Sequence, residues 1–274
     1  MNKKVIIMNF QGKTVLITGG ASGIGKLMGK MALEKGAGQL IIWDINEPLM
    51  IQVVEELQSY GNVAGFTCNL SDTDSIRSAF EKTTGVFPKI DVLINNAGVV
   101  VGKYFDEHSL EDIRLTMEIN AIAPMYLIQL FLPVLKQRPQ ACICNIASSA
   151  GLISNPKMSV YVASKWSLLG FSDSIYIEFK HQKYPIGVTT VTPYYINTGM
   201  FDGVKSFIPI IKPEKAAKKI IRGIEKNKRF VSMPWTIRMI RLLQAALPAS
   251  WFDKIAGDWM GIYHTMDAFK GRKS

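Results

Sequence analysis

Short apolar runs alternate with amphipathic stretches along most of the chain. The runs carry apolar residues on both faces, which is typical of strands that lie between two layers of helices. Since helical patterns separate these runs, the sequence predicts βαβ units and a parallel sheet. The predicted strands are residues 14–17, 40–43, 63–67, 92–94, 142–146 and 188–191, and the predicted helices are residues 24–35, 48–60, 73–83, 110–136 and 160–181.

The pattern indicates one domain rather than several. A length of 274 residues suits a single large α/β domain with a substantial core. Neither an internal repeat nor a linker interrupts the alternation. We therefore predict a doubly wound Rossmann fold over residues 1–274, with residues 199–274 as a substrate-side cap and C-terminal extension. Ser109 and the acidic residues after it predict a capping box at the start of helix 110–136.

Composition places the protein among ordinary globular proteins, with 48% apolar and 20% charged residues. The three cysteines, Cys68, Cys142 and Cys144, lack the spacing of metal ligands, so we expect buried thiols and no metal site. No run reaches the roughly 18 apolar residues of a membrane span. The apolar run near the N-terminus ends at Asn9, which is too early for a signal peptide. We therefore expect a cytoplasmic protein.

The net charge of +10 is concentrated between Lys212 and Arg229 and at the C-terminal tail. Such a run most often forms the solvated face of a helix. A surface for anionic lipid is the second interpretation. The chain has no nucleic-acid recognition motif, so we expect no nucleic-acid partner.

A glycine-rich segment joins the first predicted strand to the first helix. Glycines let the backbone turn tightly and approach a pyrophosphate, and the helix N-terminus offers unpaired N–H groups to it. Asp44 ends the second strand, where a carboxylate accepts hydrogen bonds from ribose hydroxyls and repels a 2′-phosphate. This arrangement predicts NAD rather than NADP as the cofactor. The residues predicted to hold it here are Gly19, Ser22, Gly23, Ile24, Gly25 and Asp44.

Tyr161 and Lys165 are spaced by one helical turn and therefore share a face of helix 160–181. A free tyrosine has a pKa near 10 and is a poor base at neutral pH. A lysine ammonium about 4 Å away contributes roughly 4 kcal/mol of Coulomb energy in a partly shielded site. We therefore expect Lys165 to lower the pKa of Tyr161 into the range of a general acid/base.

Together with three other motifs, this pair resembles the short-chain dehydrogenase/reductase family. The other motifs are the glycine segment, Asn95-Asn96-Ala97-Gly98 and the stretch 145–151, and order and spacing agree over about residues 12–200. The resemblance implies that Ser148 binds the substrate oxygen and that Asn120 supports a water chain for proton exchange. It also implies that Lys165 holds the nicotinamide ribose. Further cofactor contacts that it implies are Asn69, Leu70, Asn96, Ala97, Gly98, Tyr161, Pro193, Ile196 and Thr198.

The chain departs from the family pattern at two positions. Tyr194 follows Pro193 where the family normally has glycine, so we expect a side chain that crowds or reshapes the nicotinamide side of the site. Asn69 replaces an aspartate that commonly reads adenine, and an amide can still donate and accept there.

Residues 197–205, the Pro213-Glu214 pair and the long C-terminal extension resemble the branch with retinol dehydrogenases and lipid-droplet 17β-hydroxysteroid dehydrogenases. The resemblance implies an apolar, bulky or long-chain alcohol or ketone as substrate. Within 235–247, Trp235, Met239 and Leu242 share one helical face with Leu243 and Ala246. This face could meet a membrane surface, cover the pocket or contact another subunit.

Two other functions stay open from the sequence. A 3-oxoacyl reductase would use the basic stretch to meet an acidic carrier protein, although Asp44 argues against the NADP that reductive synthesis draws on. A non-catalytic NAD-binding sensor or scaffold would keep the fold, although the set Ser148, Tyr161, Lys165 and Asn120 is complete. The resemblance also implies a homo-oligomer that pairs through the helices of Asn120 and Tyr161.

Overall fold

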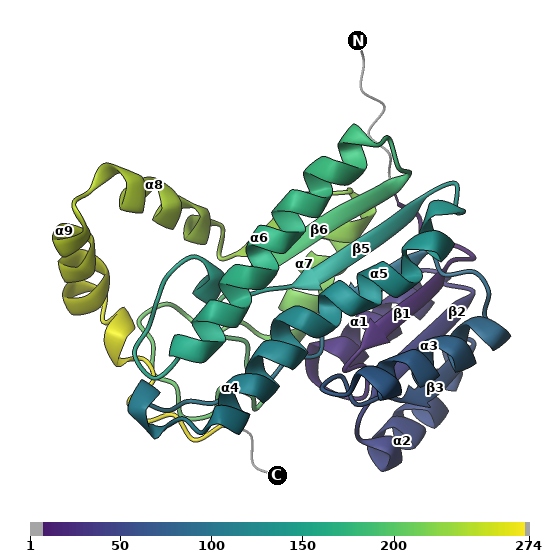
Figure 1. Cartoon of the computed structure of the whole chain (residues 1–274), viewed down its shortest axis with the longest axis horizontal. Coiled ribbons are helices and arrows are strands. Elements are labelled where there is room, and N and C mark those ends of the chain that lie inside the picture. The colour runs from purple at the N-terminus through teal and green to yellow at the C-terminus, as the bar shows by residue number, and fades with distance from the viewer. Residues whose placement is uncertain (1–7, 272–274) are drawn as a thin grey trace.

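A parallel sheet with strand order β3-β2-β1-β4-β5-β6-β7 forms the centre of the computed structural model (Figure 1). The structure describes residues 8–271, apart from the side chains of Arg238, Arg241 and Asp258. Most of the N-terminal apolar run and the last basic residues therefore lie outside the described part. The strands are β1 Thr14–Thr18, β2 Gln39–Asp44, β3 Val63–Thr67, β4 Val92–Asn95, β5 Ala141–Ile146, β6 Ile186–Pro193 and β7 Phe230–Met233.

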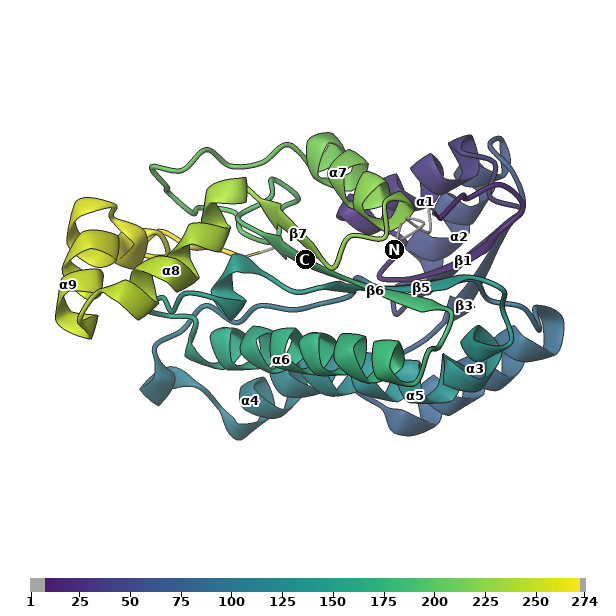
Figure 2. The same ribbon diagram turned by 90° about the horizontal axis from the view of Figure 1, so that it is seen from above.

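Helices cover both faces of the sheet, which confirms the doubly wound fold (Figure 2). One face carries α1 Gly23–Glu34, α2 Glu47–Gln58 and α7 Pro213–Glu225. The opposite face carries α3 Thr73–Val86, α4 Leu110–Met117, α5 Ala123–Lys136 and α6 Ser159–His181. The strand order reverses between β1 and β4, and ligands of such sheets bind at the carboxyl ends of the strands at this point.

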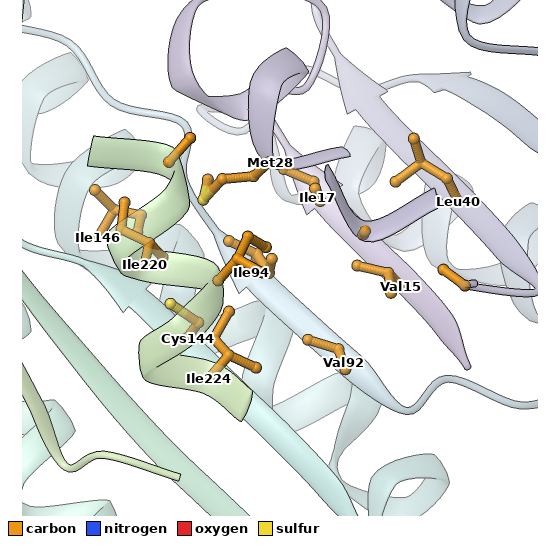
Figure 3. Close-up of a cluster of buried hydrophobic side chains, with 14 of the residues drawn as sticks. Val15, Ile17, Met28, Leu40, Val92, Ile94, Cys144, Ile146, Ile220 and Ile224 are labelled. Atoms are coloured by element: carbon orange, nitrogen blue, oxygen red, sulfur yellow. The ribbon is translucent and has the colours of Figure 1, made fainter. Parts of the chain in front are cut away.

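The core between α1, α7 and the sheet explains the basic stretch of the sequence (Figure 3). Ile220 and Ile224, one turn apart on α7, are buried in this cluster together with Met28 of α1. The opposite side of α7 exposes its lysines and Arg222. The basic run therefore forms the outer face of an amphipathic helix.

The helix predicted at 110–136 is present but is interrupted by one π-helical turn, Glu118–Ile122. Its capping box is confirmed, because Ser109 Oγ accepts from Asp112 N at 3.0 Å while Asp112 Oδ2 accepts from Ser109 N at 3.0 Å. Contrary to our expectation, Leu110–Lys136 is long and apolar enough to cross a membrane, the only such helix in the described part. Phe131 and Leu135 are fully buried against the sheet, and this packing accounts for its apolar character.

After β7 the chain forms an extension that reaches away from the sheet and returns (Figure 1). It contains a 3₁₀ turn Trp235–Arg238, α8 Met239–Ala246, α9 Ala249–Asp253, a π-helical turn Lys254–Trp259 and a 3₁₀ turn Ile262–His264. Its end pairs with the loop after β6, where Lys205 N donates to Thr265 O at 3.2 Å and Lys270 N donates to Asp202 O at 2.8 Å. The extension is therefore attached to the loop that borders the site described below. All three cysteines are buried and free, as expected.

Candidate active site

The glycine segment between β1 and α1 has the geometry that requires glycine. Gly19 and Gly23 have φ angles of +62° and +54°, a region that other residues rarely adopt. A Cβ on Gly25 would lie 2.2 Å from the carbonyl oxygen of Gly19 and 2.6 Å from Asn96 Nδ2. The segment thus leaves its backbone open for a ligand at the start of α1.

The Asn95–Gly98 motif holds this segment in place. Asn96 Nδ2 donates to the carbonyl oxygens of Thr18 at 3.0 Å and Gly19 at 3.1 Å. Thr18 Oγ1 in turn accepts from the backbone N–H groups of Asn96 and Ala97. The motif predicted as a cofactor contact therefore also fixes the loop that would receive the pyrophosphate.

Asp44 lies at the carboxyl end of β2 and faces the same segment. Its Oδ2 accepts from Ala21 N at 3.0 Å and its Oδ1 from Asn46 N at 3.1 Å. The cap of α2 is Asn46, whose Oδ1 accepts from Leu49 N, so Asp44 does not serve as that cap. The carboxylate remains at the edge of the cavity, where a ribose would lie.

A cavity of about 290 Å³ at the carboxyl ends of the strands joins the glycine segment to the catalytic residues. Every predicted site residue lines it except Gly25, which packs against Gly19, and Asn120. Ile45, Val99 and Phe201 also line the cavity, although they are not among the predicted site residues. Ile45 and Val99 belong to no motif, so only the fold brings them here, whereas Phe201 lies in the segment 197–205 that resembles the retinol dehydrogenase branch.

Tyr161 and Lys165 lie side by side on α6, and Ser148 follows β5. Tyr161 and Lys165 are each 4% exposed, and Ser148 lines the same cavity and lowers the pKa of the Tyr161 phenol. Lys165 Nζ donates to the carbonyl oxygen of Ile146 at 3.0 Å and lies 5.7 Å from the centre of the Tyr161 ring. The structure thus brings together three of the four residues that the sequence predicted as the catalytic set.

Asn120 occupies the π-helical turn before α5 and connects three segments. Its Oδ1 accepts from Val99 N at 2.9 Å, and its Nδ2 donates to Val99 O at 2.8 Å and to Ser164 Oγ at 3.1 Å. A Cβ on Gly98 would lie 3.1 Å from Asn120 Oδ1 and 3.4 Å from Lys165 Nζ. Asn120 and Lys165 therefore both lie next to Gly98, where a larger residue would crowd their side chains.

The pKa values of Tyr161 and Lys165 differ from our expectation. Burial raises the pKa of Tyr161 to about 12, and the hydrogen bond from Ser148 lowers it only in part. Burial also lowers the pKa of Lys165 to about 8. The spacing predicts a lysine that stabilises the phenolate. In the structure both side chains are desolvated, and the Lys165 ammonium donates to the carbonyl oxygen of Ile146. In the protein without its cofactor, desolvation therefore changes the pKa of Tyr161 more than the charge of Lys165 does.

The residue that replaces the family glycine is accommodated by the substrate-side wall. Tyr194 is 7% exposed, and its hydroxyl is hydrogen-bonded to Ser206 Oγ at 2.8 Å. Its ring lies 4.6 Å from that of Tyr195, which in turn lies 5.0 Å from that of Phe201. The three rings build an aromatic wall beside Tyr161.

The match to a family model agrees with this geometry. The model described as short chain dehydrogenase matches residues 13–208. The chain therefore belongs to the short-chain dehydrogenase/reductase family of oxidoreductases.

Relatives match over nearly the whole chain. Epidermal retinol dehydrogenase 2 from Mus musculus and that from Homo sapiens are each 32% identical over 272 residues, which span 97% of this chain and 87% of the relative. Short-chain dehydrogenase/reductase 3 from Homo sapiens is 27% identical over 265 residues, which span 95% of this chain and 87% of the relative. The similarity therefore extends into the C-terminal extension.

Solved structures share the fold. A short-chain dehydrogenase/reductase from Burkholderia phymatum in complex with NAD superposes with a TM-score of 0.80 at 22% identity, covering 87% of this chain and 95% of that one. The apo form of LigD from Sphingobium sp. strain SYK-6 gives a TM-score of 0.75 at 22% identity, covering 87% and 99%.

Proposed function

We propose that this protein transfers a hydride between NAD(H) and an apolar alcohol or ketone, with Tyr161 as the acid/base. The observation that carries the proposal is the buried arrangement of Tyr161, Ser148 and Lys165 in one cavity with the glycine segment. In oxidation Tyr161 takes the alcohol proton, and Ser148 steadies the substrate oxygen through a hydrogen bond. Lys165 passes the proton toward solvent along a water chain that Asn120 supports, and the roles reverse in reduction.

The residues present fit a bound NAD. The segment at Gly19 and Gly23 leaves the backbone bare, as a pyrophosphate requires, and Asp44 offers a carboxylate at the ribose position. Asn69 and Leu70 line the adenine side, and the loop from Pro193 lines the nicotinamide side. When bound, the cofactor supplies the hydride acceptor and, in its oxidised form, a positive ring that favours the phenolate of Tyr161.

The substrate class rests on the relatives and on the wall of the pocket. Two relatives are named retinol dehydrogenases, and Tyr194 and Phe201 line the cavity here, with the Tyr195 ring packed against both. Such a wall suits a large apolar molecule that carries one oxygen.

A panel of retinol, steroid alcohols and long-chain secondary alcohols tests this function, with NADH absorbance as the readout. We expect turnover with one apolar class and NAD, and rates with NADP lower by about 100-fold or more, because the Asp44 carboxylate repels the 2′-phosphate. Tight NADH binding without turnover of any alcohol or of the corresponding ketones would contradict it and favour a non-catalytic NAD-binding protein.

We also propose that the C-terminal extension lies on a membrane surface. The face predicted from 235–247 is unpacked, with Trp235 68% and Leu242 62% exposed, whereas Ile237 is buried beside the pocket. Two further tryptophans of the extension, Trp251 and Trp259, are 66% and 75% exposed. Tryptophan favours the membrane–water interface, and a net charge of +10 favours anionic lipid.

Vesicle sedimentation tests the membrane proposal. We expect the protein to pellet with phosphatidylcholine vesicles that contain phosphatidylserine, and the bound fraction of W235Q/L242Q/W259Q to fall by about tenfold or more, because the apolar anchors are lost. Ile51→Gln on α2, a residue that is 50% exposed, is the control and should bind like the wild type. Equal pelleting of the triple variant would sink the proposal.

The homo-oligomer stays a prediction. Tyr126 on α5 and Trp166 and Ile177 on α6 are exposed apolar residues that a partner subunit would cover, which the molar mass in solution would show.

A further inference from the structure

One buried hydroxyl of the C-terminal extension joins three segments beside the substrate side. Thr265 is 2% exposed, and its Oγ1 donates to the carbonyl oxygen of Ile262 at 2.9 Å. The same oxygen lies 2.7 Å from the amide of Asn155 and 3.0 Å from the hydroxyl of Tyr195. A hydroxyl offers one proton and two lone pairs, so three partners use its full capacity. The extension, the loop between β5 and α6 and the loop after β6 therefore meet at this one atom.

Of these partners, Tyr195 belongs to the aromatic wall of the site. Its ring lies 4.6 Å from the ring of Tyr194 and 5.0 Å from that of Phe201. The Phe201 ring in turn meets the ring of Tyr161 edge-on, at 6.0 Å and 80°. Tyr194 and Phe201 line the catalytic cavity. Tyr195 is therefore the middle ring of the wall, and its hydroxyl is the end that Thr265 holds.

Packing alone does not fix this wall. A second cavity, of about 30 Å³, borders Tyr194, Tyr195 and Phe201 on the side of Ser148. Side chains next to a cavity lack some of the contacts that a close-packed interior supplies. Hydrogen bonds are directional, whereas apolar contacts are not. The bonds of the Tyr195 hydroxyl therefore determine where the ring lies.

The other hydrogen bonds of the Tyr195 hydroxyl do not replace the one to Thr265. The Asn155 amide lies 3.1 Å from this hydroxyl, but the amide is itself bonded to Thr265. Met158 Sδ, at 3.7 Å, is a weak acceptor. Loss of the Thr265 hydroxyl would therefore release the end of the Tyr195 ring and also loosen the stronger of its two remaining partners.

We propose that Thr265 is a positioning residue of the active site. Its hydroxyl holds Tyr195, and through it Phe201, where the aromatic wall contacts a bulky apolar substrate. The proposal rests on the proposed function, since it concerns the same substrate. Thr265 does not line the catalytic cavity, so it acts through Tyr195 and not on the reacting atoms. The hydroxyl therefore contributes to binding of the apolar body of the substrate and not to the proton transfer at Tyr161.

The competing interpretation is that Thr265 only attaches the extension to the rest of the chain. Backbone hydrogen bonds already do this, because Lys205 N donates to Thr265 O at 3.2 Å and Lys270 N donates to Asp202 O at 2.8 Å. Neither bond uses the Thr265 side chain. Removal of the hydroxyl therefore separates the two interpretations, since it keeps the attachment and changes only what holds Tyr195.

Thr265→Val and Thr265→Ser test the proposal, with NAD and the panel alcohol that the wild type oxidises. Valine keeps the shape of threonine without its hydroxyl, and serine keeps the hydroxyl. We expect Thr265→Val to raise KM for the alcohol by about tenfold, with kcat and KM for NAD changed by less than about threefold, because the wall binds the substrate body alike before and in the transition state. Thr265→Ser should stay within about threefold of the wild type in all three constants.

Thr189→Val is the matched control. Thr189 lies in β6, is fully buried and borders neither cavity, so loss of its hydroxyl should leave KM for the alcohol unchanged. A fall in kcat at constant KM in Thr265→Val would indicate loss of folded enzyme and would overturn the positioning role. An increase of KM in Thr189→Val as large as that in Thr265→Val would overturn it as well.

A double-mutant cycle shows whether the effect passes through Tyr195. Tyr195→Phe keeps the ring and removes the hydroxyl, so it should raise KM for the alcohol about as much as Thr265→Val does. The double variant should bind no worse than either single variant, whereas additive effects would overturn the proposal. If Thr265→Val does not fold, an unchanged KM in Tyr195→Phe overturns it. All of these results leave the proposed function intact, which fails only if the wild type oxidises no alcohol and reduces no ketone.

Discussion

Tyr161→Phe is expected to lower kcat/KM by about a thousandfold or more while NADH binding changes by less than about twofold. Phenylalanine keeps the ring that contacts Phe201 at a centroid distance of 6.0 Å but removes the one hydroxyl placed to exchange a proton with the substrate. Steady-state oxidation of the best panel alcohol gives the rate, and quenching of protein fluorescence by NADH gives the affinity.

A second tyrosine of the same cavity serves as the control. Tyr194 lines the cavity, but its hydroxyl is paired with Ser206 Oγ at 2.8 Å and has no part in the proposed proton transfer. Tyr194→Phe should therefore lose less than about tenfold in kcat/KM. If Tyr161→Phe retained activity similar to that of Tyr194→Phe, the assignment of the acid/base would be wrong.

The central sheet could be predicted from the sequence because its strands are buried on both faces. All six predicted strands are present, and β1 extends one residue further to Thr18, whose hydroxyl holds Asn96 and Ala97. The edge strand β7 was missed. Its four residues, Phe230–Met233, include Ser232 and directly follow the basic run, so they form no apolar run of their own. Pairing with β6, rather than local pattern, makes them a strand.

The site was predictable where function depends on short local motifs. The glycine segment, Asp44 and the Tyr161–Lys165 pair each lie within a few residues, and the fold places them around one cavity. The pKa of Tyr161 was predicted in the wrong direction, because one lysine four residues away was counted and the burial of both groups was not. Residue spacing indicates which charged side chain lies near a titratable group. It does not indicate how far folding removes that group from water, and this desolvation determines the pKa here.

The substrate side could not be predicted because its contacts join distant segments. Asn155 and Thr265 are separated by 110 positions, and neither belongs to a motif. For the apolar face of residues 235–247, the sequence likewise does not show what the face contacts. Its periodicity identifies an apolar stripe, and only the folded chain shows that Trp235 and Leu242 remain uncovered.

Asp44→Asn is expected to reduce the preference for NAD over NADP from about 100-fold or more to about tenfold or less. A carboxylate about 5 Å from a 2′-phosphate opposes it by roughly 3 kcal/mol at an effective dielectric constant of 20, which corresponds to about two powers of ten. Asparagine removes this charge but keeps an oxygen that can accept from Ala21 N, a bond of 3.0 Å in the wild type. The glycine segment should therefore keep its position, and kcat/KM with NAD should fall by no more than about tenfold.

The ratio of kcat/KM for the two cofactors measures this effect, because a general loss of stability or activity cancels in it. Asp72→Asn provides the matched charge removal. Asp72 caps α3 by accepting from Asp74 N at 2.9 Å, asparagine caps a helix equally well, and Asp72 does not line the cavity. Its cofactor ratio should equal that of the wild type. A ratio unchanged in Asp44→Asn as well would place the discrimination elsewhere on the adenosine side, with Ile45 and Asn69 as the nearest residues of the cavity wall.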